Sequence, residues 1–428
     1  SPASQAAPSE PRGQKLTATQ PTVEQAPSRM LPLVGGMLLN VVLGTSYAWS
    51  TFVPPLEKEF GWTRTQTSIT FTIIVLNIGF WFLVAGRLQD RMNPRPLALV
   101  GGILFALGFF LGSMTTSLPW LYLAFGMMIG AGNGIGYCIT IPVVTKWFPD
   151  RRGAAVGAVI AAYGLGSGVW GPLAGMLIES MGWQAVFRLY GAMFFVLATV
   201  GAWFLTNPPA GWSPAGWDPS SEKKVVARTS RDVPTGEMLK HPTFYFLWLA
   251  YLLGSAAGLM LISQIVPFGT KAGIPQVATI GLLAGAIGNM SGRFLSAWFS
   301  DTFGRVNTLR LMMLVSAISM PLLYAFQANV VAFSIGVVVV YYCYGTLLSV
   351  FAATSADFYG TKYMGLNYGL LFSAWGMSAL VGPIIGGRVY DAFGSYRVAF
   401  LLASGLSILA ILCLFGAKMP EERPANHD

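Results

Sequence analysis

One arginine lies deep inside an apolar stretch of this chain. The segment 276–300 is long and apolar enough to cross a bilayer as a helix, yet it carries Arg293, and Asp301 begins the next charged loop. At a rise of ~1.5 Å per residue, the guanidinium lies ~12 Å from that loop, near the middle of a hydrocarbon core ~30 Å thick. A lone guanidinium there costs ~2.5–3.5 kcal/mol on insertion scales. Arg293 therefore needs a partner or a water-filled cavity.

The other charged residues offer no evident partner for Arg293. Among 26 Lys and Arg residues it is the only one well inside an apolar span, and none of the 17 Asp and Glu residues lies that deep. A bound carboxylate is the best candidate, because guanidinium and carboxylate groups form paired, charge-assisted hydrogen bonds. The alternative is a structural arginine that bonds helix carbonyls or cavity water.

Polar and aromatic residues of several spans could complete an anion site. Asn289 lies one helical turn before Arg293 and either orients the guanidinium or fills a polar gap between helices. Tyr137 and Tyr344 offer hydroxyl donors for a carboxylate and rings for a short alkyl chain. Three further aromatic residues are expected to line the apolar part of the cavity: Tyr47, Phe372 and Trp375. Plain helix packing explains each of these three equally well.

Composition places the chain in a membrane. It has 428 residues, of which 54% are hydrophobic and 10% charged, and its mean hydropathy is +0.59. The net charge of +9 comes from loops and suits anionic headgroups, so we expect membrane lipid and no nucleic acid as a partner. The two histidines, His241 and His427, and three scattered cysteines predict no metal site, and we expect no cofactor.

Two other classes of protein fit the sequence less well. A membrane-embedded enzyme would need a nucleophile–base pair or a metal cluster, and no such constellation is found. A sensor built on a membrane bundle would need a signalling domain, for which the short loops and tails leave no room. We therefore expect no enzyme activity.

Twelve apolar spans predict an all-α membrane protein. A single long polar segment, 207–240, divides them six and six. The spans lie near 31–56, 66–88, 96–115, 118–144, 152–178, 184–206, 242–268, 276–300, 306–326, 329–354, 363–389 and 396–417.

The domain organisation follows from these spans. We expect a disordered cytoplasmic tail over 1–28, a six-helix half over 29–206, a cytoplasmic linker over 207–240, a second six-helix half over 241–417 and a cytoplasmic tail over 418–428. Lys and Arg are more frequent on the side of the tails and linker, which predicts that both termini are cytoplasmic in the cell (inner or plasma) membrane. No cleavable signal peptide is visible.

The two halves repeat each other. Asp90 after the second span matches Asp301 after the eighth (301 − 90 = 211). Glycines of the fifth span recur in the eleventh at the same spacing, including Gly171-Pro172 as Gly382-Pro383. Two pseudo-symmetric halves predict a binding site at their interface, near the midplane of the membrane.

The loop after the second span carries a family resemblance. Gly86–Arg95 reads GRLQDRMNPR, and its second copy, Ala297–Arg305, reads AWFSDTFGR. Both resemble the signature loop of the major facilitator superfamily, with departures at Asn93 and Pro94 in the first copy and at Ala297 and Thr302 in the second. The resemblance implies the major facilitator fold. Four loop residues are expected to act in gating and not in substrate binding: Asp90, Arg91, Asp301 and Arg305.

Within that superfamily the chain resembles the monocarboxylate transporters and the oxalate–formate exchangers. The similarity includes Lys146–Gly153 (KWFPDRRG) and Pro242–Trp248 (PTFYFLW), and Arg293 matches the arginine that both branches use for the substrate carboxylate. Trp375 stands where the exchangers carry a membrane-embedded lysine, and Asn289 where animal monocarboxylate transporters carry an aspartate. A dianion would therefore lack a second cation.

These observations predict a secondary transporter that works by alternating access. The expected substrate is a small monocarboxylate anion such as lactate or pyruvate, and the resemblance implies symport with a proton. Because no titratable side chain lies deep in the spans, exchange of one carboxylate for another is the alternative. The sequence leaves the oligomeric state open, with a monomer as one option.

Overall fold

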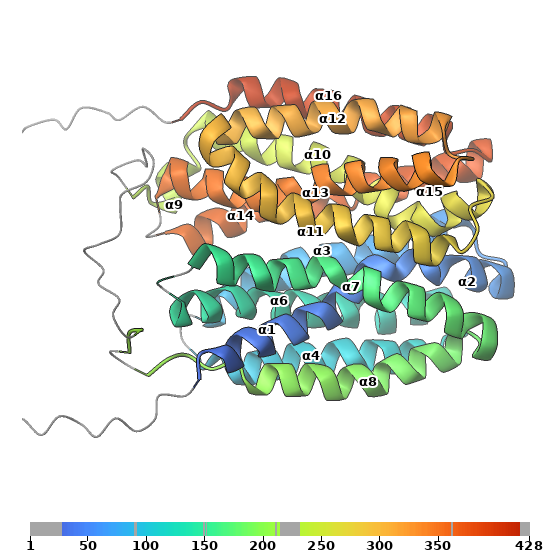
Figure 1. Ribbon diagram of the computed structural model, residues 1–428, viewed down its shortest axis with the longest axis horizontal. Coiled ribbons are helices and arrows are strands. Elements are labelled where there is room, and N and C mark those ends of the chain that lie inside the picture. Colours follow the sequence, from blue (N-terminus) through green and yellow to red (C-terminus); the bar gives the residue numbers. More distant parts are fainter. Residues whose placement is uncertain are drawn as a thin grey trace, which may run out of the picture.

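The helices of the computed structural model run along one common axis (Figure 1). The structure describes residues 28–89, 92–148, 150, 152–209, 212–214, 232–360 and 363–419, and no strand occurs in this part of the chain. α1 (Met30–Leu43) begins and α16 (Arg397–Gly416) ends at the same end of the bundle, which we call the termini end. The opposite end, where α2 (Val53–Phe60) lies, is called the far end.

Each of the six spans predicted for the first half is helical. After α1 the chain continues through a 3₁₀ helix, η1 (Gly44–Thr51), into α2. The remaining elements of this half are α3 (Arg64–Gln89), α4 (Pro94–Gly112), α5 (Leu118–Leu121), the π-helix η2 (Tyr122–Met127), α6 (Met128–Trp147), α7 (Arg152–Met181) and α8 (Trp183–Trp203).

The second half follows the same plan. A short α9 (Thr235–Met238) precedes it. Its spans are α10 (Pro242–Lys271), α11 (Val277–Phe303), α12 (Arg305–Ala325), α13 (Val330–Tyr359), the pair α14 (Met364–Ser378) and α15 (Gly382–Phe393), and α16.

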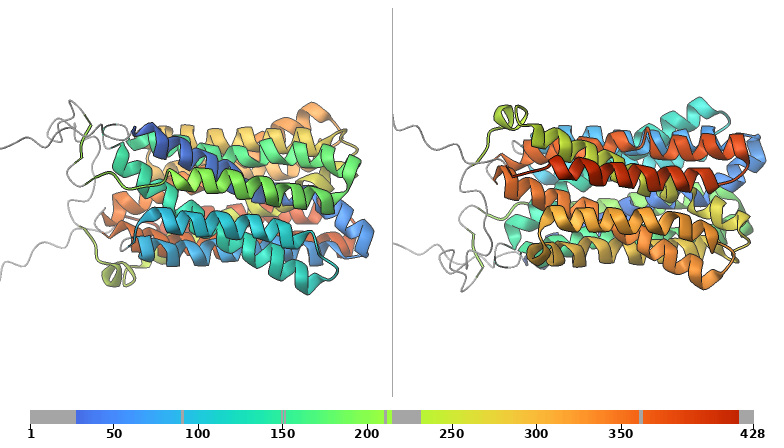
Figure 2. Two further views of the ribbon diagram at one scale, coloured as in Figure 1. Left: turned by 90° about the horizontal axis from the view of Figure 1, so that it is seen from below. Right: turned by 90° about the horizontal axis from the view of Figure 1, so that it is seen from above.

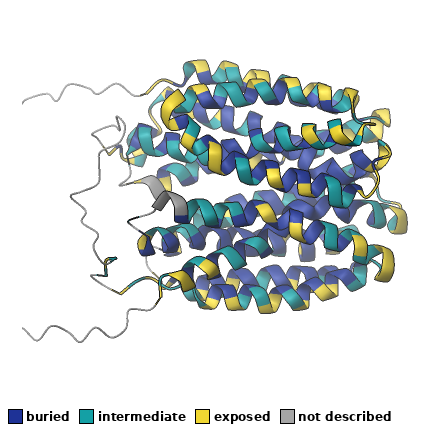
Figure 3. Cartoon of the chain, viewed as in Figure 1, coloured by how far each residue is buried: buried dark blue, intermediate teal, exposed yellow. Residues whose placement is uncertain are grey.

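The spans are long and apolar enough to be membrane helices. Eleven of those in the described residues meet both criteria, and α11, with 27 residues, is also long enough but less apolar because it carries Asn289 and Arg293. Helices suit a bilayer because they satisfy their backbone hydrogen bonds internally. Large apolar side chains are exposed on the outer helices, as Leu401, Leu409 and Phe415 are on α16 (Figure 3). The chain is an all-α membrane protein, as its sequence predicts.

The helices form two groups. α1 to α8 pack mainly among themselves, and so do α10 to α16 (Figure 2). The repeat extends to details of packing: Gly134 of α6 abuts the carbonyl of Ile78, and Gly345 of α13, at the matching position, abuts that of Asn289. The groups meet where α11 packs against α7 and where α3 packs against α14 and α15.

The contact of α3 with α14 and α15 lies at a break in the eleventh span. α14 ends at Ser378 and α15 begins at Gly382-Pro383, whereas α7 continues through the matching Pro172. Thr72 of α3 donates a hydrogen bond (2.9 Å) to the carbonyl of Ala379 in the break. Close by, Gly79 of α3 meets Gly376 of α14, and a Cβ atom on Gly79 would lie 3.1 Å from the Cα of Gly376.

Candidate functional site

Arg293 lies where the two groups of helices meet. Its side chain is on α11, which packs between α13 and α7, and only 5% of the residue is exposed. Two glycines of this helix lie against the backbone of α13. A Cβ atom at Gly292 would lie 2.1 Å from the carbonyl oxygen of Tyr342, and one at Gly288 would lie 2.2 Å from that of Val338. The glycines therefore serve close helix packing.

The guanidinium of Arg293 has neutral partners. Nε donates to Oδ1 of Asn289 (2.9 Å), while Nη1 and Nη2 lie at 3.4 and 3.5 Å from the hydroxyl oxygens of Tyr137 and Tyr47. The group lies over the ring of Tyr163, with 5.4 Å from Cζ to the ring centroid. No acidic side chain of the described residues pairs with it. A buried cation thus has hydrogen bonds but no counter-charge.

Asn289 has an unused donor beside this cation. The residue is 1% exposed, and its Nδ2 has no hydrogen-bond partner among the described residues. A buried donor without a partner costs about 1–3 kcal/mol. Asn289 thus contacts Arg293 through Oδ1, and its Nδ2 can donate to a further acceptor.

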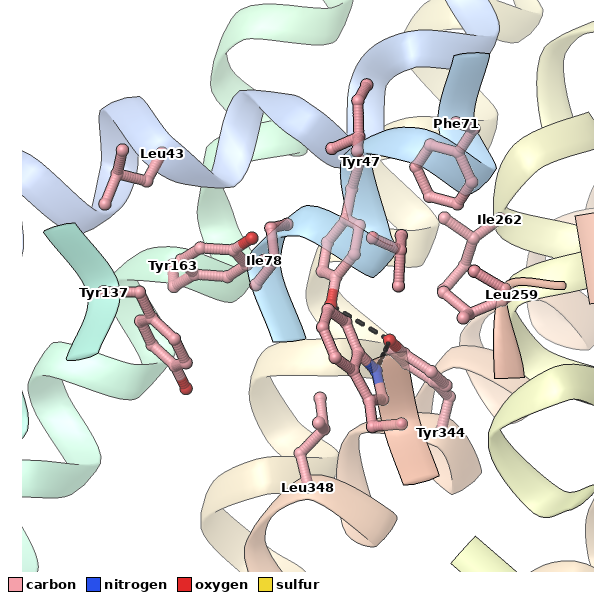
Figure 4. Packing of buried hydrophobic residues seen from close by; sticks show 14 of the residues in the cluster. Leu43, Tyr47, Phe71, Ile78, Tyr137, Tyr163, Leu259, Ile262, Tyr344 and Leu348 are labelled. Atoms are coloured by element: carbon pink, nitrogen blue, oxygen red, sulfur yellow. Dashed lines mark hydrogen bonds between the residues drawn. The ribbon is translucent and has the colours of Figure 1, made fainter. Parts of the chain in front are cut away.

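A chain of hydrogen bonds joins three of the predicted aromatic residues (Figure 4). The hydroxyls of Tyr47 and Tyr344 are 3.0 Å apart, and Nε1 of Trp375 donates to the Tyr344 hydroxyl (2.6 Å). Phe372 stacks on Trp375 at a centroid distance of 4.9 Å. Residues from both halves therefore share one polar network that begins at Arg293.

These side chains enclose a narrow cavity. Five of the seven predicted binding residues line it, and the other two, Asn289 and Tyr344, bond to lining residues. The lining consists of Tyr47, Ile78, Tyr137, Tyr163, Arg293, Leu348, Phe372 and Trp375. It is polar and cationic around Arg293 and apolar around Ile78, Leu348 and Phe372.

Sequence reasoning missed three of the lining residues, Tyr163, Ile78 and Leu348. For two of them the repeat contains a signal. Tyr163 stands just before Gly164, as Trp375 stands just before the matching Gly376, and Ile78 matches Asn289 in the packing described above.

Two of the predicted gating residues, Asp301 and Arg305, lie outside the lining of this cavity. Asp90 and Arg91 are outside the described residues. Arg305 pairs with Asp301 (Nη2 to Oδ1, 2.5 Å) and with Asp357 (Nε to Oδ2, 2.9 Å), so it joins α11, α12 and α13 at the termini end. All three belong to the second half.

A second polar cluster, absent from the sequence-based predictions, joins the two halves at the far end. Arg64, at the start of α3, forms a bidentate pair with Glu57 of α2 (2.6 and 2.7 Å). Its Nη1 also donates to the hydroxyl of Tyr396 and to Oε1 of Gln264 (3.4 Å), both in the second half. Gln264 in turn donates to Ser68 of α3 (2.8 Å). We call this set the far-end cluster.

Asp391 of α15 extends the far-end cluster to the backbone. Its carboxylate accepts from the backbone N–H groups of Arg64 (3.1 Å) and Thr65 (2.8 Å) and from the Thr65 hydroxyl. These are free donors of the first turn of α3, where a negative charge is favourable. The described residues contain no group of three or more His, Cys, Asp or Glu side chains that could hold a metal ion.

Comparison with known proteins gives consistent matches. A family model described as the Major Facilitator Superfamily matches residues 36–310 and 276–428. The chain is 28% identical to the oxalate:formate antiporter of Oxalobacter formigenes over 376 residues, 87% of each chain. It is 27% identical to monocarboxylate transporter 13 of Rattus norvegicus over 377 residues, 86% of this chain and 84% of that protein.

A solved structure shares the fold. The crystal structure of a bacterial homologue of the human lysosomal transporter Spinster, in an inward-facing and unoccupied conformation, matches with a TM-score of 0.64. The match covers 91% of this chain and 95% of that one, at 17% sequence identity.

Proposed function

Because this chain belongs to the major facilitator superfamily, we propose that it is a secondary active transporter of a small monocarboxylate anion. It is a multi-pass membrane protein of a transporter family and not an enzyme. The proposed substrate is of the lactate or pyruvate type, and transport proceeds by alternating access. Two relatives are named for carboxylates, one as an oxalate:formate antiporter and the other as a monocarboxylate transporter.

The observation that carries this proposal is the unneutralised guanidinium of Arg293. A carboxylate beside it would supply the missing counter-charge and accept from the free Nδ2 of Asn289. The Tyr137 and Tyr47 hydroxyls lie at long distances from the guanidinium and are placed to turn toward an anion. Neutralising a buried charge removes the penalty of closing a dry cavity around it, which couples substrate binding to closure.

The cavity favours one carboxylate over two. Among the described residues, Arg293 is the only cationic side chain in its lining, and Ile78, Leu348 and Phe372 present apolar surface. A short alkyl chain suits that surface. The second carboxylate of a dicarboxylate would be buried there without a cation, at a considerable cost.

The far-end cluster supports alternating access. It holds α3 of the first half to α10, α15 and the start of α16 in the second half, and opening at this end requires those hydrogen bonds to break. We propose that the termini end is cytoplasmic in the cell membrane, that 1–28 and 418–428 are cytoplasmic tails, and that Asp90, Arg91, Asp301 and Arg305 act in gating on that side.

Coupling to a proton is proposed from the resemblance, and one observation favours the alternative. In the part of the chain that the structure describes, the cavity lining contains no His, Asp, Glu or Lys. Asp357, a carboxylate near the end of α13, pairs with Arg305. Exchange of one carboxylate for another needs no such group. Counterflow in proteoliposomes with and without a pH gradient distinguishes symport from exchange. A transport rate that is the same with and without the gradient excludes symport.

The test of the site uses labelled lactate, pyruvate, formate and acetate in proteoliposomes. Arg293→Gln and Arg293→Lys should abolish uptake of any acid that the parent carries, while both variants still insert and elute as the parent does. Arg188→Gln, which removes an exposed cation from α8, is the matched control and should transport normally. Normal uptake by either Arg293 variant would refute the proposal.

A further inference from the structure

A fully buried amide supports the aromatic wall of the site. Asn133 of α6 is 0% exposed. Its Nδ2 lies at 2.9 Å from the carbonyl oxygen of Leu43, 2.8 Å from Oγ of Ser46 and 3.0 Å from the hydroxyl of Tyr163. The Tyr163 hydroxyl donates to its Oδ1 (3.2 Å). An amide nitrogen has two hydrogens, so Nδ2 can donate to Leu43 and Ser46 while Oδ1 accepts from Tyr163, and every polar atom is satisfied.

Both partners of Asn133 lead to the guanidinium of Arg293. Tyr163 presents its ring to that cation, and the ring also packs against those of Tyr137 (4.7 Å) and Tyr47 (5.5 Å). Leu43 and Ser46 flank the start of η1, the 3₁₀ helix that carries Tyr47. One amide therefore joins three spans of the first half around the site, where Figure 4 shows Leu43, Tyr47 and Tyr163.

The second half contains a matching hydrogen bond. Tyr344 of α13 stands at the repeat position of Asn133, one residue before Gly345 as Asn133 is before Gly134, and Trp375 stands at that of Tyr163. Trp375 donates to the Tyr344 hydroxyl (2.6 Å). In each half a polar residue of the fourth or tenth span thus fixes an aromatic ring of the fifth or eleventh span beside Arg293.

We propose that Asn133 is a positioning residue for the substrate site. It holds the Tyr163 ring against the Arg293 guanidinium and fixes η1, so that the tyrosine hydroxyls and the cation keep the geometry that one carboxylate requires. It does not contact the substrate itself. This inference rests on the proposed function of Arg293 as the carboxylate-binding residue.

The test separates positioning from general stability. Asn133→Leu removes the amide at similar volume, and Tyr163→Phe removes only the hydroxyl that bonds to it. Lactate uptake is measured in proteoliposomes, and thermal shift is titrated with lactate, pyruvate and acetate on the same preparations. Asn40→Leu is the matched control, because Asn40 is an equally buried amide of the same half. It bonds Thr140 and the Val159 carbonyl, and none of these three residues lines the cavity.

The expected result is a change in half-saturation without a matching loss of maximal rate. Asn133→Leu and Tyr163→Phe should each raise the half-saturating concentration about three- to tenfold, the range for one lost hydrogen bond. The double variant should have a half-saturating concentration no higher than that of Asn133→Leu alone, because both changes remove the same hydrogen bond. Asn40→Leu should lower thermal stability and leave half-saturation unchanged.

Two results would overturn the inference. One is parental half-saturation in Asn133→Leu, and the other, which decides the matter if that variant does not fold, is parental half-saturation in Tyr163→Phe. If Arg293→Gln abolishes binding while these variants bind normally, only the positioning role of Asn133 fails. If no acid of the panel stabilises the parent, the proposed function fails as well.

Discussion

The carboxylate of Asp391 caps the helix that begins at Arg64. It accepts the backbone N–H of Arg64 (3.1 Å) across 327 positions of the chain, so one half of the protein completes a helix terminus of the other. A capping carboxylate satisfies free donors and interacts favourably with the helix dipole. Its loss should therefore act on the contact between the halves more than on either half alone.

The first prediction concerns this cap. Asp391→Asn removes the charge and weakens the far-end contact by about 0.3–1 kcal/mol, which is roughly a two- to fivefold shift toward states open at that end. Position 68 is buried in the far-end cluster. The thiol of Ser68→Cys should therefore react faster, by the same factor, with a water-soluble thiol reagent when Asp391→Asn is also present. Because Asp391 is exposed, the effect should shrink at high salt.

The control for this experiment is Glu179→Gln, which removes an exposed carboxylate from α7. It should leave the labelling rate of Ser68→Cys unchanged.

A cross-link tests the same contact directly. A disulfide between Ser68→Cys and Gly387→Cys should block transport until it is reduced, because a Cβ atom on Gly387 would lie 2.8 Å from Oγ of Ser68. If Ser68→Cys is labelled at the same rate with and without Asp391→Asn, the cap does not hold the halves together.

The second prediction introduces a counter-ion for Arg293. In Asn289→Asp, a carboxylate would occupy the place of the amide oxygen that now lies 2.9 Å from Nε of Arg293. At neutral pH this internal pair competes with the substrate, so anion affinity should fall at least about tenfold. Lowering the pH protonates the aspartate, frees the guanidinium and should restore uptake.

The measurement is the pH dependence of uptake at fixed substrate anion concentration. Uptake by Asn289→Asp should rise more steeply toward acid pH than uptake by the parent. Uptake by Asn289→Leu should stay low at every pH and follow the shape of the parental profile. An Asn289→Asp profile that follows that of the parent would mean that Asn289 does not face the anion.

The third prediction adds a second cation to the cavity. Trp375→Lys places an ammonium in the same lining as Arg293 and removes the hydrogen bond to Tyr344. Oxalate should then bind, and at 100 times its Kd it should stabilise the variant by about 2.7 kcal/mol. Trp375→Met, which opens the same space without a charge, should show no oxalate-dependent stabilisation. Oxalate binding by the methionine variant would place the second carboxylate elsewhere.

The fourth prediction concerns the packing of α11 on α13. A Cβ atom at Gly292 would lie 2.1 Å from the backbone oxygen of Tyr342, so Gly292→Ala forces the helices apart and should destabilise the protein by about 1–3 kcal/mol. On α16, Gly405 has no neighbouring atom within 4 Å of its Cβ position. Gly405→Ala should therefore be neutral or slightly stabilising, because alanine is the better helix former. Thermal unfolding in detergent compares the two.

Much of this architecture is readable from the sequence because a bilayer imposes a simple rule on it. Each span must satisfy its backbone internally, so length and hydropathy alone locate the helices. The repeat then pairs spans two and eight, and five and eleven, and so predicts a site between the halves, at the depth where Arg293 lies in span eight. The depth of a single cation within an apolar helix is sufficient to indicate the candidate site.

The far-end cluster and the role of Asn133 depend on contacts that the sequence does not encode locally. Arg64 lies at a helix start, where a basic residue is normally a topology signal, and only the packed halves bring Tyr396 and Gln264 to it. The same dipeptide, Gly-Pro, is continuous helix in α7 and a break before α15. Tertiary packing decides between these outcomes, because the local signal is identical.

The meeting of Gly79 and Gly376 has a consequence for motion. Two backbones touch there with no side chains between them. Neither helix therefore has a side chain at this point that would clash with the other helix during a movement. Rotation of one half against the other can pass through this point with little steric resistance. Any residue larger than glycine at either position would push α3 and α14 apart, and the size of its side chain would change the angle between the two halves.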